Sequence, residues 1–105
     1  MSRKLILRPQ AEMDRTSHFL YLGQRSPQAA LRFDQAIEAA LKKICSTPNV
    51  GANLTLSAVA HLNLRFYRPS GFDKYLIIYR LTDDTIYVTR ILHGAQDVEA
   101  AVLES

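Results

Sequence analysis

The strongest structural constraint in the sequence is an apolar stripe that begins after Ser26-Pro27. Serine is a favoured N-cap residue, and proline suits the first helical position because the N–H that it lacks would have no partner there. Apolar residues then recur at spacings of three and four, which is the period of one helical face. The helix is expected to stop at Thr47-Pro48, because proline disfavours the helical conformation in the residue before it. The stripe consists of Ala30, Phe33, Ile37, Leu41 and Ile44.

The residues before this helix predict a short strand and another helix. Residues 3–8 place three consecutive apolar side chains between basic ones, which is typical of a short strand. Pro9 suits the first turn of a helix, and residues 10–22 are expected to be helical, with Gly23 ending the helix. Because only Gly-Gln-Arg connects the two predicted helices, we expect them to form an antiparallel helical hairpin.

After Gly51 the pattern becomes that of strands. Residues 61–66 alternate between apolar and polar, residues 74–81 are apolar on both faces, and residues 85–92 predict one further strand. Turn-forming residues separate these segments, and residues 98–103 predict a short C-terminal helix or an ordered tail. The fold class is therefore predicted to be α+β: an N-terminal strand and a helical hairpin, followed by a three-stranded antiparallel meander.

Length and composition limit the protein further. A chain of 105 residues with 48% apolar and 22% charged residues is typical of one globular domain, so residues 1–105 are expected to form a single domain. The one cysteine, Cys45, excludes an internal disulfide and fits a reducing compartment. No apolar run has the length of a signal peptide or a membrane span, so we expect a cytoplasmic protein without a membrane partner. The net charge of +3 favours acidic partners.

The sequence carries no signal for a cofactor or a metal. The three histidines, His18, His61 and His93, lack the short spacing of metal ligands and have no cysteine partners nearby. There is also no glycine-rich loop of the kind that holds phosphate groups. We therefore expect neither a metal nor a cofactor.

Six groups of residues occur in an order and at spacings that are found together in one known family. They are Pro9-Gln10-Ala11 with Asp14 and Tyr21-Leu22, Ser26-Pro27 with Ala30 and Phe33, Ser46-Thr47-Pro48 with Gly51, Leu64-Arg65, the strand from Tyr75 to Arg80, and Arg90-Ile91-Leu92-His93-Gly94 with Asp97. Together they resemble the ParE/RelE toxin superfamily of type II toxin–antitoxin systems. Arg15 and His18 depart from the pattern, because the family usually has apolar residues there, and this predicts different packing or a polar groove at the first helix.

The resemblance implies a toxin that is neutralised by a cognate antitoxin in a hetero-oligomer. ParE-type members bind DNA gyrase and trap its cleaved DNA complex, whereas RelE-type members cleave mRNA on the ribosome. RelE-type catalysis uses Lys, Arg and a late Tyr or His, but residues 91–105 contain no Lys, Arg or Tyr. We therefore predict a ParE-like gyrase inhibitor without catalytic residues of its own. The alternative is a ribosome-dependent endoribonuclease whose catalytic residues are Arg65, Arg90 and His93.

The candidate antitoxin-binding residues combine cations with apolar side chains. A disordered acidic segment that folds on binding needs both kinds of contact. Alternatively, the arginines form internal pairs with aspartates. Either interpretation fits Arg65 and Arg90, whereas the central position of its predicted strand favours an internal role for Arg80. The aspartates considered are Asp73, Asp83 and Asp97. The candidate antitoxin-binding residues are Arg65, Arg68, Arg80, Arg90, Leu62 and Leu64.

Overall fold

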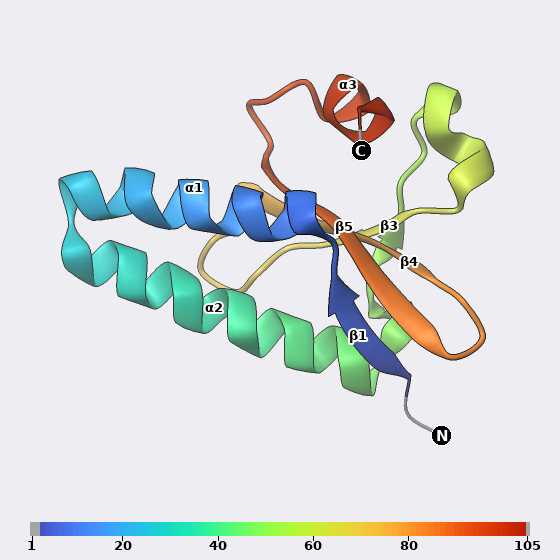
Figure 1. Ribbon diagram of the computed structural model, residues 1–105, viewed down its shortest axis with the longest axis horizontal. Coiled ribbons are helices and arrows are strands. Elements are labelled where there is room, and N and C mark those ends of the chain that lie inside the picture. Colours follow the sequence, from blue (N-terminus) through green and yellow to red (C-terminus); the bar gives the residue numbers. More distant parts are fainter. Residues whose placement is uncertain (1–2, 105) are drawn as a thin grey trace.

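The computed structural model describes residues 3–104 as a five-stranded sheet with two long helices on one face (Figure 1). The predicted α+β order is confirmed, and no helix of the described part is long and apolar enough to cross a membrane. The elements are β1 (Lys4–Leu7), α1 (Pro9–Arg25), α2 (Pro27–Ser46), the 3-10 helix η1 (Pro48–Val50), β2 (Ala52–Asn53), the 3-10 helix η2 (Ser57–Leu62), β3 (Arg65–Tyr67), β4 (Tyr75–Leu81), β5 (Thr85–His93) and α3 (Val98–Leu103).

The sheet contains more strands than the predicted meander. The meander itself is present, since β3, β4 and β5 pair antiparallel in succession. The N-terminal strand β1 joins the sheet beside β5 in parallel orientation, and the short strand β2 extends the opposite edge. The strand order is β1-β5-β4-β3-β2, so the sheet is mixed and β1 and β2 form its two edges.

Ser26 ends the first long helix and starts the second. Its N–H donates to the carbonyl oxygen of Leu22 at 2.9 Å, and its hydroxyl accepts from the N–H of Ala29 at 3.2 Å. The predicted end of α1 at Gly23 is wrong, because the helix continues to Arg25. The helix ends where Pro27 requires an extended residue before it, and Ser26 has φ −159° and ψ 111°. Ser26 and Pro27 therefore set the boundary between α1 and α2, and Gly23 does not.

Two hydrophobic cores lie on opposite faces of the sheet. The larger core lies under the helical hairpin, and all five residues of the predicted α2 stripe are buried in the structure. The smaller core lies on the other face of the sheet, under η2 and α3. Figure 1 shows these two helices on the side of the sheet away from α2. The residues buried in the smaller core are Val59, Leu64, Leu76, Ile78, Leu92 and Val102.

The strand predicted over residues 61–66 begins later than predicted, because β3 spans Arg65–Tyr67. Residues up to Leu62 belong to η2, which ends at Asn63 with a left-handed φ of 53°, and pairing with β4 begins only at Arg65. Asparagine tolerates this conformation better than most residues do. The alternation of Leu62 and Leu64 therefore does not reflect one face of a strand: Leu64 is 3% exposed and Leu62 is 38% exposed.

Candidate functional site

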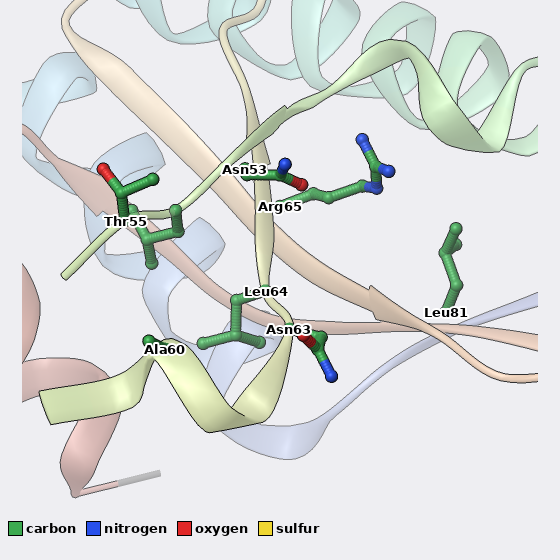
Figure 2. Close-up of a pocket in the computed structure, with 8 residues that line it drawn as sticks. Asn53, Thr55, Ala60, Asn63, Leu64, Arg65 and Leu81 are labelled. Carbon is green, nitrogen blue, oxygen red and sulfur yellow. The ribbon is translucent and has the colours of Figure 1, made fainter. Parts of the chain in front are cut away.

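Two hollows flank the chain where η2 turns into β3, and they share Leu64. The first, the edge hollow, has a volume of about 470 Å³ and lies beside the start of β3 (Figure 2). Its lining combines carboxamide, hydroxyl and guanidinium groups with four apolar side chains. It is lined by Asn53, Leu54, Thr55, Ala60, Asn63, Leu64, Arg65 and Leu81.

The second hollow, the central hollow, lies on the sheet face that carries the smaller core. It has a volume of about 180 Å³ and combines two arginines with three apolar side chains and one hydroxyl. Its lining residues are Arg8, Leu62, Leu64, Arg80, Thr89 and Val102. Four of the six candidate residues predicted from the sequence, Arg65, Arg80, Leu62 and Leu64, therefore line one or both hollows.

Arg65 is fixed in the edge hollow by backbone carbonyl groups. Its Nη1 donates to the Gly51 oxygen at 2.7 Å and contacts the Asn49 oxygen at 3.5 Å. Gly51 is in turn held by Tyr79, whose hydroxyl accepts from the Gly51 N–H at 2.9 Å and donates to the Pro48 oxygen at 2.7 Å. A Cβ at position 51 would lie 2.5 Å from the Tyr79 hydroxyl oxygen, so this approach requires glycine.

Arg80 is half-buried and Arg68 is exposed, and the guanidinium of each lies over an aromatic ring. The guanidinium of Arg80 is 5.0 Å from the ring centroid of Tyr87, and that of Arg68 is 5.5 Å from Phe66. Arg68 also donates to the backbone oxygen of Asp73 at 2.6 Å. Arg80 faces the central hollow, whereas Arg68 lines neither hollow. Stacking on Tyr87 therefore holds a positive charge in the lining of the central hollow.

Arg90 is a buried part of the fold, which corrects its assignment to an exposed binding surface. The residue is 7% exposed, and its Nε and Nη2 donate to the two carboxylate oxygens of Asp14 at 2.7 and 2.9 Å. Its Nη1 donates to the Ala101 oxygen of α3 at 2.8 Å. The hydrogen bond with Asp14 raises the pKa of Arg90. Asp14 is the carboxylate partner of Arg90, which the sequence analysis did not consider.

Asp14 and His18 of α1 bind the backbone of Ile91 where β1 no longer covers β5. The Ile91 N–H donates to Asp14 Oδ2 at 3.0 Å, and His18 Nε2 donates to the Ile91 oxygen at 2.8 Å. An irregularity in the β4–β5 pairing leaves Thr89 as an extra residue. The extra residue shifts the alternation of backbone directions along β5. As a result, the backbone N–H and C=O of Ile91 point toward α1.

The departures at Arg15 and His18 have structural explanations. Arg15 forms ion pairs with Asp34 at 2.8 Å and with Glu38 at 3.0 Å, so it links α1 to α2. His18 lies edge-on to Tyr75, with ring centroids 5.0 Å apart. Burial lowers the pKa of His18, although its hydrogen bond to the backbone acts in the opposite direction. The unusual polar residues of α1 are therefore part of its packing against α2 and β5.

His93 is also held within the fold. Its Nδ1 accepts from the Ala95 N–H at 3.0 Å, and its ring lies edge-on to Tyr75 at 4.9 Å. Within residues 3–104, no three His, Cys, Asp or Glu side chains are grouped so that they could hold a metal ion. The candidate site therefore consists of the cations and apolar side chains that line the two hollows.

Comparison with known proteins identifies the family of this chain. Residues 5–98 match the model of the ParE toxin of type II toxin–antitoxin systems, so the chain belongs to this toxin family. It is 30% identical over 96 residues to Toxin RelE1 of Caulobacter vibrioides, with 91% of this chain and 98% of that protein covered. It is 29% identical over 105 residues to Toxin ParE2 of Mycobacterium tuberculosis, with 99% and 93% covered. As a toxin of this class, it has a cognate antitoxin as its partner.

Proposed function

We propose that this toxin inhibits DNA gyrase and is not a nuclease. The observation that carries the proposal is the engagement of the three residues that nuclease chemistry would require. Arg90 is paired with Asp14, Arg65 is bonded to the Gly51 carbonyl, and His93 Nδ1 accepts a backbone N–H. Arg65 also lies two strands away from β5, which carries the other two residues. Cleavage of RNA needs a base, an acid and cations gathered around one phosphate.

Two parallel assays test this proposal. Purified toxin is expected to inhibit supercoiling by gyrase and to accumulate cleaved DNA, while mRNA on translating ribosomes stays intact. The His93→Ala variant is expected to retain gyrase inhibition within about twofold, since the proposed activity uses no proton transfer. Cleavage of mRNA that depends on ribosomes and is abolished by His93→Ala would establish the endoribonuclease alternative instead.

The central hollow is the proposed docking site for the antitoxin. Arg8 and Arg80 provide two cations beside the apolar side chains of Leu62, Leu64 and Val102. The volume of about 180 Å³ suits one or two apolar side chains of a partner. An acidic segment that folds on binding would place apolar anchors in this hollow and carboxylates against its arginines. Arg65 and Arg68 form the outer part of the proposed surface, and the buried Arg90 is no longer included.

A paired set of variants tests the location of this interface. Arg8→Ala with Arg80→Ala is expected to raise the Kd for the antitoxin by about 100-fold or more, because charge-assisted hydrogen bonds contribute about 1.5–3 kcal/mol each and two are lost. Arg32→Ala with Lys43→Ala removes the same charge from the exposed face of α2 and is expected to change the Kd by less than about threefold. Titration calorimetry measures both. A larger effect from the α2 pair would place the antitoxin on the helical hairpin.

A further inference from the structure

Arg65, which lines the edge hollow, has hydrogen-bond donors that the fold leaves unused. Its Nη1 contacts the Gly51 and Asn49 oxygens, whereas no hydrogen-bond partner of its Nε or Nη2 is found among residues 3–104. The same part of the chain contains no ion pair between Arg65 and a carboxylate. Because the hydroxyl of Tyr79 holds Gly51 and Gly51 holds Arg65, the guanidinium is positioned before any ligand arrives. A guanidinium with unused donors is suited to an anion.

The other polar side chains of the edge hollow both donate and accept hydrogen bonds. Asn53 lies directly opposite Arg65 in the pairing of β2 with β3, and Figure 2 shows the two side chains beside each other. Asn63 and Thr55 add a second carboxamide and a hydroxyl, and both residues are exposed. Carboxamides match the donors and acceptors on the edge of a nucleobase. Among the described residues that line the hollow, none is acidic, so the lining does not repel an anion.

The end of β4 adds backbone groups and an apolar wall to the same hollow. In the sheet register, β3 pairs with β4 only as far as Tyr79, and Leu81 lies two residues further along. The Thr82 N–H donates to the Thr85 oxygen on the β5 side, so the N–H and C=O of Leu81 point the other way, past the end of β3. The apolar lining residues are Leu54, Ala60, Leu64 and Leu81.

We propose that the edge hollow binds one nucleotide of a DNA strand. The phosphate binds the unused donors of Arg65, the base edge binds the carboxamides and the Leu81 backbone, and the leucines contact the faces of the base. The volume of about 470 Å³ is within the range of small-molecule sites. Neither Arg90 nor His93 lines the hollow, so the phosphate is bound without being cleaved. The source of the nucleotide rests on the proposed function, because gyrase would bring its DNA to the toxin.

Titration of a short fluorescent single-stranded DNA with full-length toxin tests the role of Arg65. Arg65→Ala is expected to raise the Kd by about tenfold or more, because hydrogen bonds to a charged group are lost. It is also expected to lower the slope of log Kd against log salt by about 0.7, the value for one phosphate contact with a single strand. Lys43→Ala removes the same charge from the exposed face of α2 and is expected to leave the Kd within about twofold. Equal effects of the two variants would mean unspecific attraction and would overturn the proposal.

A second variant keeps the test independent of any loss of stability in Arg65→Ala. Asn63 has a left-handed φ of 53°, which glycine adopts readily, so Asn63→Gly removes the carboxamide and preserves the backbone. This variant is expected to raise the Kd by about three- to tenfold. In the unaltered toxin, DNA is expected to shift the amide resonances of Thr55 and Leu81. Binding that survives Asn63→Gly and is abolished by Arg80→Ala would place the strand in the central hollow and overturn the proposal.

Comparison of ligands identifies the source of the nucleotide. The DNA strand is expected to bind at least about tenfold more tightly than AMP, because flanking phosphates add electrostatic attraction. Equal Kd values would identify a free nucleotide as the ligand, and tighter binding of an acidic peptide of equal charge would identify a protein, and either result would overturn the proposal. Gyrase inhibition without DNA binding would overturn this inference alone. DNA binding without gyrase inhibition would support the site and overturn the proposed function.

Discussion

Replacing Asp14 with alanine is expected to destabilise the protein by about 3–5 kcal/mol, the range for removing one partner of a buried ion pair. The side chains of Arg90 and Asp14 are only 8% and 11% exposed, so water replaces the lost carboxylate poorly. The substitution also removes the acceptor of the Ile91 N–H. Urea unfolding of the purified variant measures the change in the free energy of unfolding.

Asp34→Ala is the matched control, because it removes an aspartate that also pairs with an arginine, in this case Arg15 of α1. Asp34 is 44% exposed and Arg15 is 19% exposed, so this pair is closer to water. We expect a loss of about 1 kcal/mol or less, as for other exposed pairs. If Asp14→Ala is no more destabilising than Asp34→Ala, Asp14 does not secure α1 to β5. Arg90→Met with Asp14→Leu is expected to recover part of the lost stability, since no buried charge is then left alone.

Local signals in the sequence were sufficient to predict the helical hairpin. The cap at Ser26, the proline after it and the apolar period of α2 all act within a few residues of each other, and the structure confirms each of them. Gly23 was misleading, because a glycine within a helix weakens it without ending it. The stop signal comes from Pro27, which restricts the conformation of the preceding residue.

The segment before β3 could not be predicted in the same way. Residues 61–66 contain a strand-like alternation, but that window is too short to distinguish a strand from a 3-10 turn followed by a left-handed Asn63. Only the pairing with β4 decides where the strand begins, and that pairing is a tertiary contact. Leu62, Leu64 and Arg80 nevertheless lie close together, since all three line the central hollow.

The residues missing from the predicted site depend on contacts between distant parts of the chain. Arg90 and Asp14 are 76 positions apart, and no spacing rule links them. One local signal was present: Asp14 and His18 are four residues apart, so they lie on one face of α1. Arg8 was considered only as the end of a strand. It reaches the central hollow because β1 pairs beside β5, and the sequence does not determine that strand order.

Replacing Phe33 with alanine is expected to destabilise the protein by about 3–5 kcal/mol, the range for deleting a buried aromatic ring. Phe33 is 0% exposed and lies at the centre of a ring cluster, with centroid distances of 5.0 Å to Tyr75, 5.5 Å to Phe72 and 6.0 Å to His18. Alanine would leave a cavity between α2, α1 and the sheet that these rings cannot fill without leaving their contacts with each other.

The matched control for Phe33→Ala lies two residues earlier on the same helix. Leu31 is 58% exposed, so it lies on the outer face of α2. Leu31→Ala therefore removes an apolar side chain from the same part of the helix without opening a cavity. Its free energy of unfolding in urea is expected to change by no more than about 0.5 kcal/mol, because surface substitutions usually have effects of this size. A domain of this size has a total stability of about 5–15 kcal/mol, so Phe33→Ala alone is expected to remove a large share of it. Equal effects of the two substitutions would mean that the α2 stripe does not hold the hairpin on the sheet.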